Sequence, residues 1–134
     1  MNLIELHVNT GNQKYPIFIG NNVLNKLKTI LKKNSINFNQ CLVIVDKNVP
    51  KILVDKVLKS LPKKKTLLHY FNSSEKNKDQ KSINNILSIL LTKDFNRNDC
   101  VISVGGGITG DVSGFAASIF KRGLKFINIP TTLL

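Results

Sequence analysis

Two continuous apolar runs, at residues 42–45 and 101–104, most constrain what this chain can fold into. A strand that is apolar at every position is covered on both faces, as the strands of a parallel sheet are. Each run is followed by a polar turn and then by apolar residues at helical spacing. Strands that alternate with helices in this way predict an α/β fold with a mostly parallel sheet and right-handed crossovers.

The first 31 residues follow a different pattern. Residues 2–9 alternate, with Ile4, Leu6 and Val8 on one side, which predicts a half-buried strand. A turn at 10–13 and a second strand at 15–19 would complete an N-terminal β-hairpin. Asn21 or Asn22 can then cap a helix that extends to Leu31.

The rest of the chain alternates between strands and helices. The pattern predicts helices after Pro50, after the polar loop 72–80, and from Ile108 to about Lys121, and further strands at 66–71 and 126–129. Residues 1–134 therefore form one Rossmann-like α/β domain of mostly parallel sheet and flanking helices. The sequence stops at Leu134 as a new element begins, so we expect a truncated domain.

The charge does not indicate a nucleic-acid partner. The formal net charge is +12, but 18 of the 20 basic residues are Lys and they are spread from Lys14 to Lys125. The aromatic residues do not interleave with Arg as a base-stacking surface requires. No apolar run reaches the roughly 20 residues that span a bilayer, so we expect no membrane partner and a cytoplasmic location. Cys41 and Cys100, at strand starts, are expected to be buried and reduced.

A glycine cluster follows the second apolar run. Gly105, Gly107 and Gly110 fit the pattern Gly-x-Gly-x-x-Gly between a strand and a helix. Without side chains, the backbone N–H groups and the positive end of the helix dipole can face a diphosphate. Asp111 stands where a P-loop has Lys, so a P-loop is excluded.

Dinucleotide folds usually carry an acid at the end of the strand after this turn, but that strand ends in Thr131 and Thr132. Asp46 and Asn48 follow the earlier strand instead. They could hydrogen-bond a ribose or adenine, or they could only shape the turn before Pro50.

The run from Gly105 to Leu134 resembles the 3-dehydroquinate synthase family over thirty consecutive positions, and the resemblance extends more loosely to the first strand. It implies a truncated N-terminal NAD-binding domain, without the helical C-terminal domain of that family. The resemblance implies NAD-contacting roles for Asp46, Asn48, Glu75, Lys78, Gly105, Gly106, Gly107, Asp111, Thr131 and Thr132. Ser74 departs from the family, which usually has Gly before that Glu.

The resemblance also implies a substrate, a metal and a partner. Arg122 matches an arginine that binds the substrate phosphate of the neighbouring subunit in a homodimer. The implied reaction, part of the shikimate pathway, cyclises 3-deoxy-D-arabino-heptulosonate 7-phosphate to 3-dehydroquinate with loss of phosphate. A divalent metal, zinc or cobalt, belongs to the full-length enzyme. Its ligands would lie beyond Leu134, so we expect no metal site and no catalytic residue in this chain, no turnover by it alone, and weak NAD binding.

Two alternatives remain open, and a third is disfavoured. Sister cyclases that make inosose or valiolone precursors share the glycine turn. Polyol dehydrogenases share the general fold but not the pattern from Arg122 to Thr132. The chain could also be a stand-alone nucleotide-binding module without catalysis.

Overall fold

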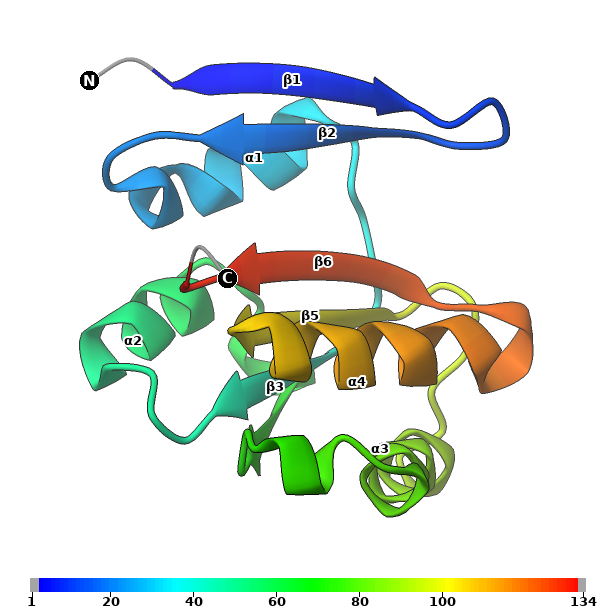
Figure 1. Cartoon of the computed structure of the whole chain (residues 1–134). Helices are drawn as coiled ribbons and strands as arrows, with labels where there is room; N and C mark the ends of the chain where they lie inside the picture. Colours follow the sequence, from blue (N-terminus) through cyan, green and yellow to red (C-terminus); the bar gives the residue numbers. More distant parts are fainter. Residues whose placement is uncertain (1–2, 133–134) are drawn as a thin grey trace.

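The computed structural model describes residues 3–132 and shows an α/β fold with a small hairpin at one end (Figure 1). The antiparallel hairpin pairs two strands, and a separate sheet has four parallel strands in the order β4-β3-β5-β6. The strands are β1 (Ile4–Asn9), β2 (Lys14–Ile19), β3 (Cys41–Asp46), β4 (Thr66–Phe71), β5 (Cys100–Gly105) and β6 (Lys125–Pro130). The α-helices are α1 (Leu27–Lys33), α2 (Lys51–Lys59), α3 (Gln80–Thr92) and α4 (Gly107–Ile119). Short 3-10 turns stand at Val23–Lys26, Lys63–Lys65, Glu75–Asn77 and Phe120–Arg122.

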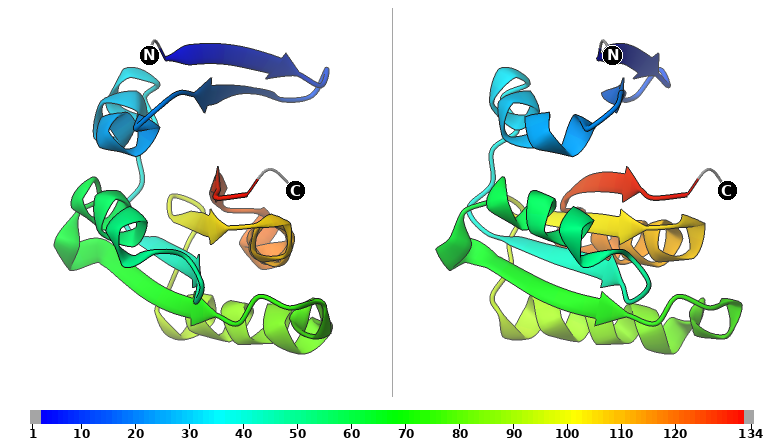
Figure 2. Two further views of the ribbon diagram at one scale, coloured as in Figure 1. Left: turned by 60° about the vertical axis from the view of Figure 1, so that its left-hand side comes forward. Right: turned by 90° about the vertical axis from the view of Figure 1, so that its left-hand side faces the viewer.

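The two central strands of the four-stranded sheet are buried on both faces. Strands β3 and β5 are almost completely buried because helices pack against the sheet from both sides. On one face, α3 and α4 enclose a core around Leu42, Ile86 and Phe95, and on the other α1 and α2 enclose one around Val43 and Val57. Figure 2 shows α2 and α3 on opposite sides of the sheet. The two apolar runs therefore correctly predicted strands that are covered on both faces.

The order of the strands creates a switch point between β3 and β5. From β3 the chain crosses through α2 to β4 on one side, and it then returns through α3 to β5 on the other side. Such a reversal leaves a crevice outside the carboxyl ends of the two central strands, where ligands of open α/β sheets bind. Both strand ends lie at the same edge of the sheet in Figure 1.

The predicted N-terminal hairpin is confirmed, but its first strand was predicted as half-buried, and that prediction is wrong for the described residues. The strands and their pairing are present, with Ile4 opposite Ile19 and Leu6 opposite Ile17. However, these side chains remain 38–48% exposed. The alternating pattern correctly identified an apolar face, but much of that face stays exposed in the described structure.

The predicted cap of the first helix is also wrong. Asn22 has a left-handed backbone (φ 55°) and its side chain makes no capping bond. The helix instead begins as a 3-10 turn before α1, with Leu27, Ile30 and Leu31 buried as predicted. The other predicted elements are confirmed, with the strand at 66–71 exact and the other stated boundaries shifted by one or two residues.

The remaining local expectations agree with the structure. Cys41 and Cys100 are paired in register on β3 and β5, are fully buried and form no disulfide. Within residues 3–132, none of the helices combines the length and apolarity needed to cross a bilayer.

Candidate functional site

The candidate site lies at the carboxyl ends of β3, β5 and β6. Here Gly105 and Gly106 pass from β5 into α4, and Asp46 ends the neighbouring β3. Thr131 donates its backbone N–H to the carbonyl of Gly105 over 2.9 Å, which joins the end of β6 to the glycine turn. The structure therefore brings Asp46, the glycine turn and the two threonines together at the switch point.

The glycines of the turn have different surroundings. A Cβ on Gly105 would lie 2.9 Å from side-chain atoms of Asp46 and Thr109, and one on Gly106 would lie 3.1 Å from the Thr132 hydroxyl. A Cβ on Gly107 would meet no atom within 4 Å. Gly105 and Gly106 thus allow close packing, whereas Gly107 faces open space at the start of the helix.

The start of α4 has the features of an anion site. No side chain caps the helix at Gly106, and its first turn carries no acidic residue. The N–H groups of a first helical turn have no partner within the helix, and the dipole makes this end positive. Among the described residues, the fully buried hydroxyl of Thr109 has no hydrogen-bond partner. A diphosphate therefore fits this turn on three counts: open space, unpaired donors and a positive dipole.

Asp46 and Asn48 form a turn of their own. The Asp46 carboxylate accepts the backbone N–H of Asn48 over 3.0 Å, and Val49 donates its N–H to the Asp46 carbonyl over the same distance. Asn48 is exposed and Asp46 half-buried. These bonds agree with a role in shaping the turn before Pro50. They also leave acceptors of Asp46 available beside the glycine turn, so the structure is compatible with ribose binding as well.

Lys78 and Asp111 form an ion pair of 3.0 Å between the loop before α3 and the second turn of α4. The hydrogen bond to Asp111 raises the pKa of Lys78. A groove of about 350 Å³ beside the pair is lined by the apolar side chains of Ile83, Val112 and Phe115. The sequence suggested each of the two charged residues separately, but their pairing bridges 33 positions and no local pattern signals it.

Two other candidate residues lie away from this centre. Glu75 opens the 3-10 turn of the same loop as Lys78 and is exposed. Arg122 follows α4 and so lies at the far end of that helix from the glycine turn, roughly 20 Å away along its axis. The structure thus separates Arg122 from the candidate cofactor residues of this chain.

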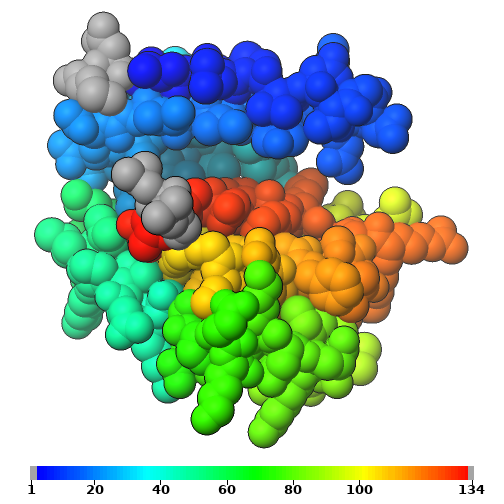
Figure 3. Space-filling view, in the orientation of Figure 1, coloured from blue at the N-terminus to red at the C-terminus, as the bar shows by residue number. Residues whose placement is uncertain are grey.

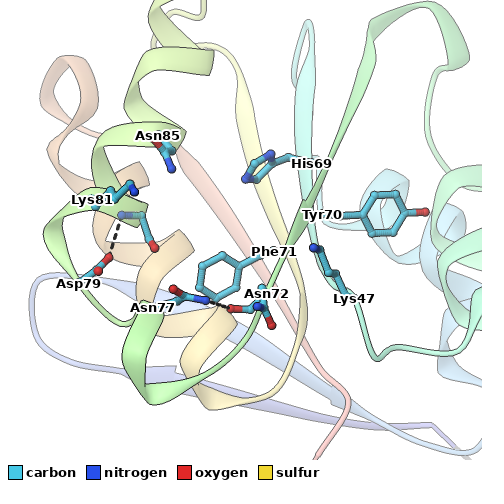
Figure 4. Close-up of a pocket in the computed structure, with 10 residues that line it drawn as sticks. Lys47, His69, Tyr70, Phe71, Asn72, Asn77, Asp79, Lys81 and Asn85 are labelled. Carbon is cyan, nitrogen blue, oxygen red and sulfur yellow. Dashed lines mark hydrogen bonds between the residues drawn. The ribbon is translucent and has the colours of Figure 1, made fainter.

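A second hollow, of about 300 Å³, lies between β4 and the start of α3. Figure 4 shows His69, Lys81 and Asn85 around it, with Phe71 deeper inside and Tyr70 on the other side of β4. Burial lowers the pKa of His69. No sequence pattern indicates this hollow, because the residues that line it come from separate segments. Among the described residues, no three His, Cys, Asp or Glu side chains lie together as a metal ion would need.

The fold and the glycine turn define a Rossmann-like α/β domain with its candidate site at the switch point. The family description "3-dehydroquinate synthase N-terminal" matches residues 68–134, and the chain belongs to that family. A 3-dehydroquinate synthase of Pelagibacter ubique is 69% identical over all 134 residues, although the chain spans only 36% of that relative's length.

Solved structures of related synthases share this fold. A 2-deoxy-scyllo-inosose synthase is 26% identical, with a TM-score of 0.83 over 96% of this chain and 36% of its own. A second structure of such a synthase, in complex with carbaglucose-6-phosphate, NAD+ and Co2+, is 26% identical, with a TM-score of 0.82 over 96% of this chain and 35% of its own. The Rossmann-like architecture that the sequence predicted is therefore confirmed.

Proposed function

We propose that this chain is the NAD-binding part of a 3-dehydroquinate synthase. The whole protein would be a carbon–oxygen lyase of the shikimate pathway, which makes precursors of aromatic amino acids. It would convert 3-deoxy-D-arabino-heptulosonate 7-phosphate into 3-dehydroquinate and phosphate. The relative with 69% identity supports this proposal by its name. The observation that carries the NAD-binding role is the open space at Gly107, at the uncapped start of α4.

Different residues at the switch point would bind different parts of NAD. We assign the backbone N–H groups at Gly105, Gly106 and Gly107 to the diphosphate, since they lie at the positive end of α4. Asp46, with Asn48, would hold a ribose from the end of β3, because a carboxylate accepts hydrogen bonds from sugar hydroxyls. Thr131 and Thr132 would close the site from β6. When bound, NAD supplies reversible hydride transfer at a ring hydroxyl of the sugar.

The loop before α3 completes the proposed cofactor site. Glu75 and Lys78 would contact NAD from this loop, and Asp111 would do so from α4. We assign no residue of this chain to the divalent metal, zinc or cobalt, that the proposed reaction requires.

Titration with NAD tests the binding role directly. Wild-type chain should show saturable shifts in a nuclear magnetic resonance titration, whereas Gly106→Val should abolish binding because a side chain there crowds Thr132. Gly107→Val is the sharper variant, because its side chain would fill open space and leave the packing of the turn unchanged. An NAD affinity unchanged in both variants would refute the role of the turn.

We also propose a cytoplasmic, homodimeric whole enzyme, and the position of Arg122 supports the homodimer. A guanidinium binds phosphate through two parallel hydrogen bonds, but Arg122 is too far from the glycine turn to reach the same ligand. It would instead serve the sugar phosphate of a second copy. Sedimentation of the whole enzyme should show a dimer, and Arg122→Ala should raise the KM for the sugar phosphate while NAD affinity is retained.

A second candidate is a sister cyclase, favoured by the TM-score of 0.83 to a 2-deoxy-scyllo-inosose synthase. The two activities differ in the sugar phosphate that they accept. Release of phosphate from the heptulosonate phosphate by the whole enzyme would support the first proposal. Release from a hexose 6-phosphate alone would support the second.

A further inference from the structure

The ion pair between Lys78 and Asp111 joins two segments that are far apart in the sequence. The Lys78 ammonium and the Asp111 carboxylate approach to 3.0 Å, and both side chains keep substantial exposure, at 44% and 64%. In Figure 3 the side chains around the start of α3 (green) reach those at the start of α4 (yellow to orange). The pair is therefore open to a ligand that arrives at the glycine turn.

The loop that carries Lys78 has few other attachments to α4. Asn77 bonds to the carbonyls of Asn72 and Ser74, and the N–H of Lys78 bonds to the carbonyl of Glu75. All these bonds stay inside the loop. Among the described hydrogen bonds and ion pairs of residues 72–78, the bond from Lys78 to Asp111 is thus the one that reaches α4.

The position of Asp111 poses an electrostatic problem. It is the fifth residue of α4, on the end that we assign to a diphosphate. A bare carboxylate there would repel the ligand, since like charges at short range are unfavourable. The Lys78 ammonium removes that repulsion, and because an ammonium has three donors, two remain for oxygen atoms of the ligand.

We propose that Asp111 is a positioning residue that holds Lys78, and with it the loop 72–78, beside the diphosphate at the start of α4. This inference rests on the NAD-binding role proposed above. It assigns Asp111 a favourable effect on anion binding although its own charge is negative. Removal of the carboxylate releases the ammonium and the loop together.

The direction in which Asp111→Asn changes the NAD affinity separates this inference from simple charge repulsion. If only charge mattered, Asp111→Asn would tighten NAD binding, because a negative group is lost. If Asp111 positions Lys78, Asp111→Asn weakens NAD binding by about two- to fivefold, the range expected for one exposed ion pair. Lys78→Met should also weaken it, and the double variant should bind no more weakly than Lys78→Met alone.

Nuclear magnetic resonance titrations of the 134-residue chain with NAD measure these effects. The matched control is Lys76→Met, which removes the same charge from the same loop; Lys76 is exposed and forms no ion pair in the described structure. Adenosine, which lacks phosphate, should bind all variants alike, which excludes a general loss of structure.

Each outcome has one reading. Weaker NAD binding by Asp111→Asn with non-additive loss in the double variant supports the inference. Additive loss overturns it, because Asp111 would then act on NAD independently of Lys78. Equal or tighter NAD binding by Asp111→Asn overturns it while the proposed function survives. Failure of the wild-type chain to bind NAD overturns the proposed function, and this inference with it.

Discussion

Gly105 and Asp46 approach so closely that a Cβ on residue 105 would lie 2.9 Å from the Cβ of Asp46. The two residues end neighbouring strands, β5 and β3, at the switch point of the sheet. The same hypothetical Cβ would meet Thr109 of α4 at 2.9 Å. A side-chain-free residue therefore lets β3, β5 and α4 meet at the candidate site.

Gly105→Ala should destabilise the chain by about 1–3 kcal/mol, the cost of forcing an extra carbon into a packed region. Urea unfolding followed by circular dichroism measures this change. The matched control is Gly107→Ala, whose Cβ would meet no atom within 4 Å. That control should leave the free energy of unfolding unchanged or slightly higher, and equal losses in both variants would contradict the packing argument.

Much of the sheet could be predicted because its strands carry their own signal. The runs 42–45 and 101–104 are apolar at every position, and only a strand covered on both faces explains that composition. The glycine turn was predictable for the same reason, since its residues are contiguous. The exposure of Ile4 and Leu6 was not predictable, because alternation shows that a strand has an apolar face but not what covers it.

The pairing of Lys78 with Asp111 lay beyond sequence reasoning for a different reason. It depends on how α3 and α4 pack side by side, and packing geometry has no local pattern. The cap of α3 was also missed, but its signal is local, because Asp is a common N-cap residue. Asp79 accepts the N–H of Ser82 over 2.9 Å, although the sequence assigned the whole stretch 72–80 to a loop.

This cap predicts a stability change in acid. The hydrogen bonds from Ser82 lower the pKa of Asp79 below its ordinary value of 3.8. Because the folded-state pKa is depressed, the stabilisation is present above the unfolded value and is lost as the pH falls through the folded one. Thermal unfolding from pH 5 to pH 2 should show this loss in the wild type. Asp79→Asn keeps a capping oxygen that does not titrate. The thermal stability of this variant should therefore fall less between pH 5 and pH 2 than that of the wild type. Identical pH dependences of the two proteins would refute the role of the cap.

The buried thiol of Cys100 predicts a change in base. Burial raises its pKa from 9.0 to about 12. Between these values the unfolded chain has lost the proton and the folded chain keeps it, so stability is full below pH 9 and is lost as the pH rises towards 12. The loss amounts to about 1.4 kcal/mol per pH unit.

Comparison with Cys100→Ala isolates this effect from the many lysines that titrate in the same range. The free energy of unfolding of the wild type, measured by urea at pH 8, 9.5 and 10.5, should fall more steeply than that of the variant. Parallel pH profiles would show that the thiol ionises in the folded chain as easily as in the unfolded one.

The turn after α4 holds two consecutive non-glycine residues in the left-handed region, Lys121 at φ 41° and Arg122 at φ 69°. Such a backbone costs an L-residue roughly 1–2 kcal/mol, and only glycine adopts it freely. The Lys121 ammonium donates to the carbonyl of Phe95 over 2.9 Å and helps to hold the turn. An exposed arginine in a strained position suggests that its side chain is kept for binding rather than for stability.

Arg122→Gly should therefore be more stable than Arg122→Ala by about 1 kcal/mol, because glycine relieves the strain that alanine keeps. Arg97 provides the matched control, since it is an exposed loop arginine without a positive φ. There the order should reverse, with Arg97→Ala more stable than Arg97→Gly, because glycine only adds freedom to the unfolded chain. Urea unfolding measures the free energy of unfolding of the four variants. If the alanine and glycine variants rank in the same order at both positions, the backbone at Arg122 is not strained.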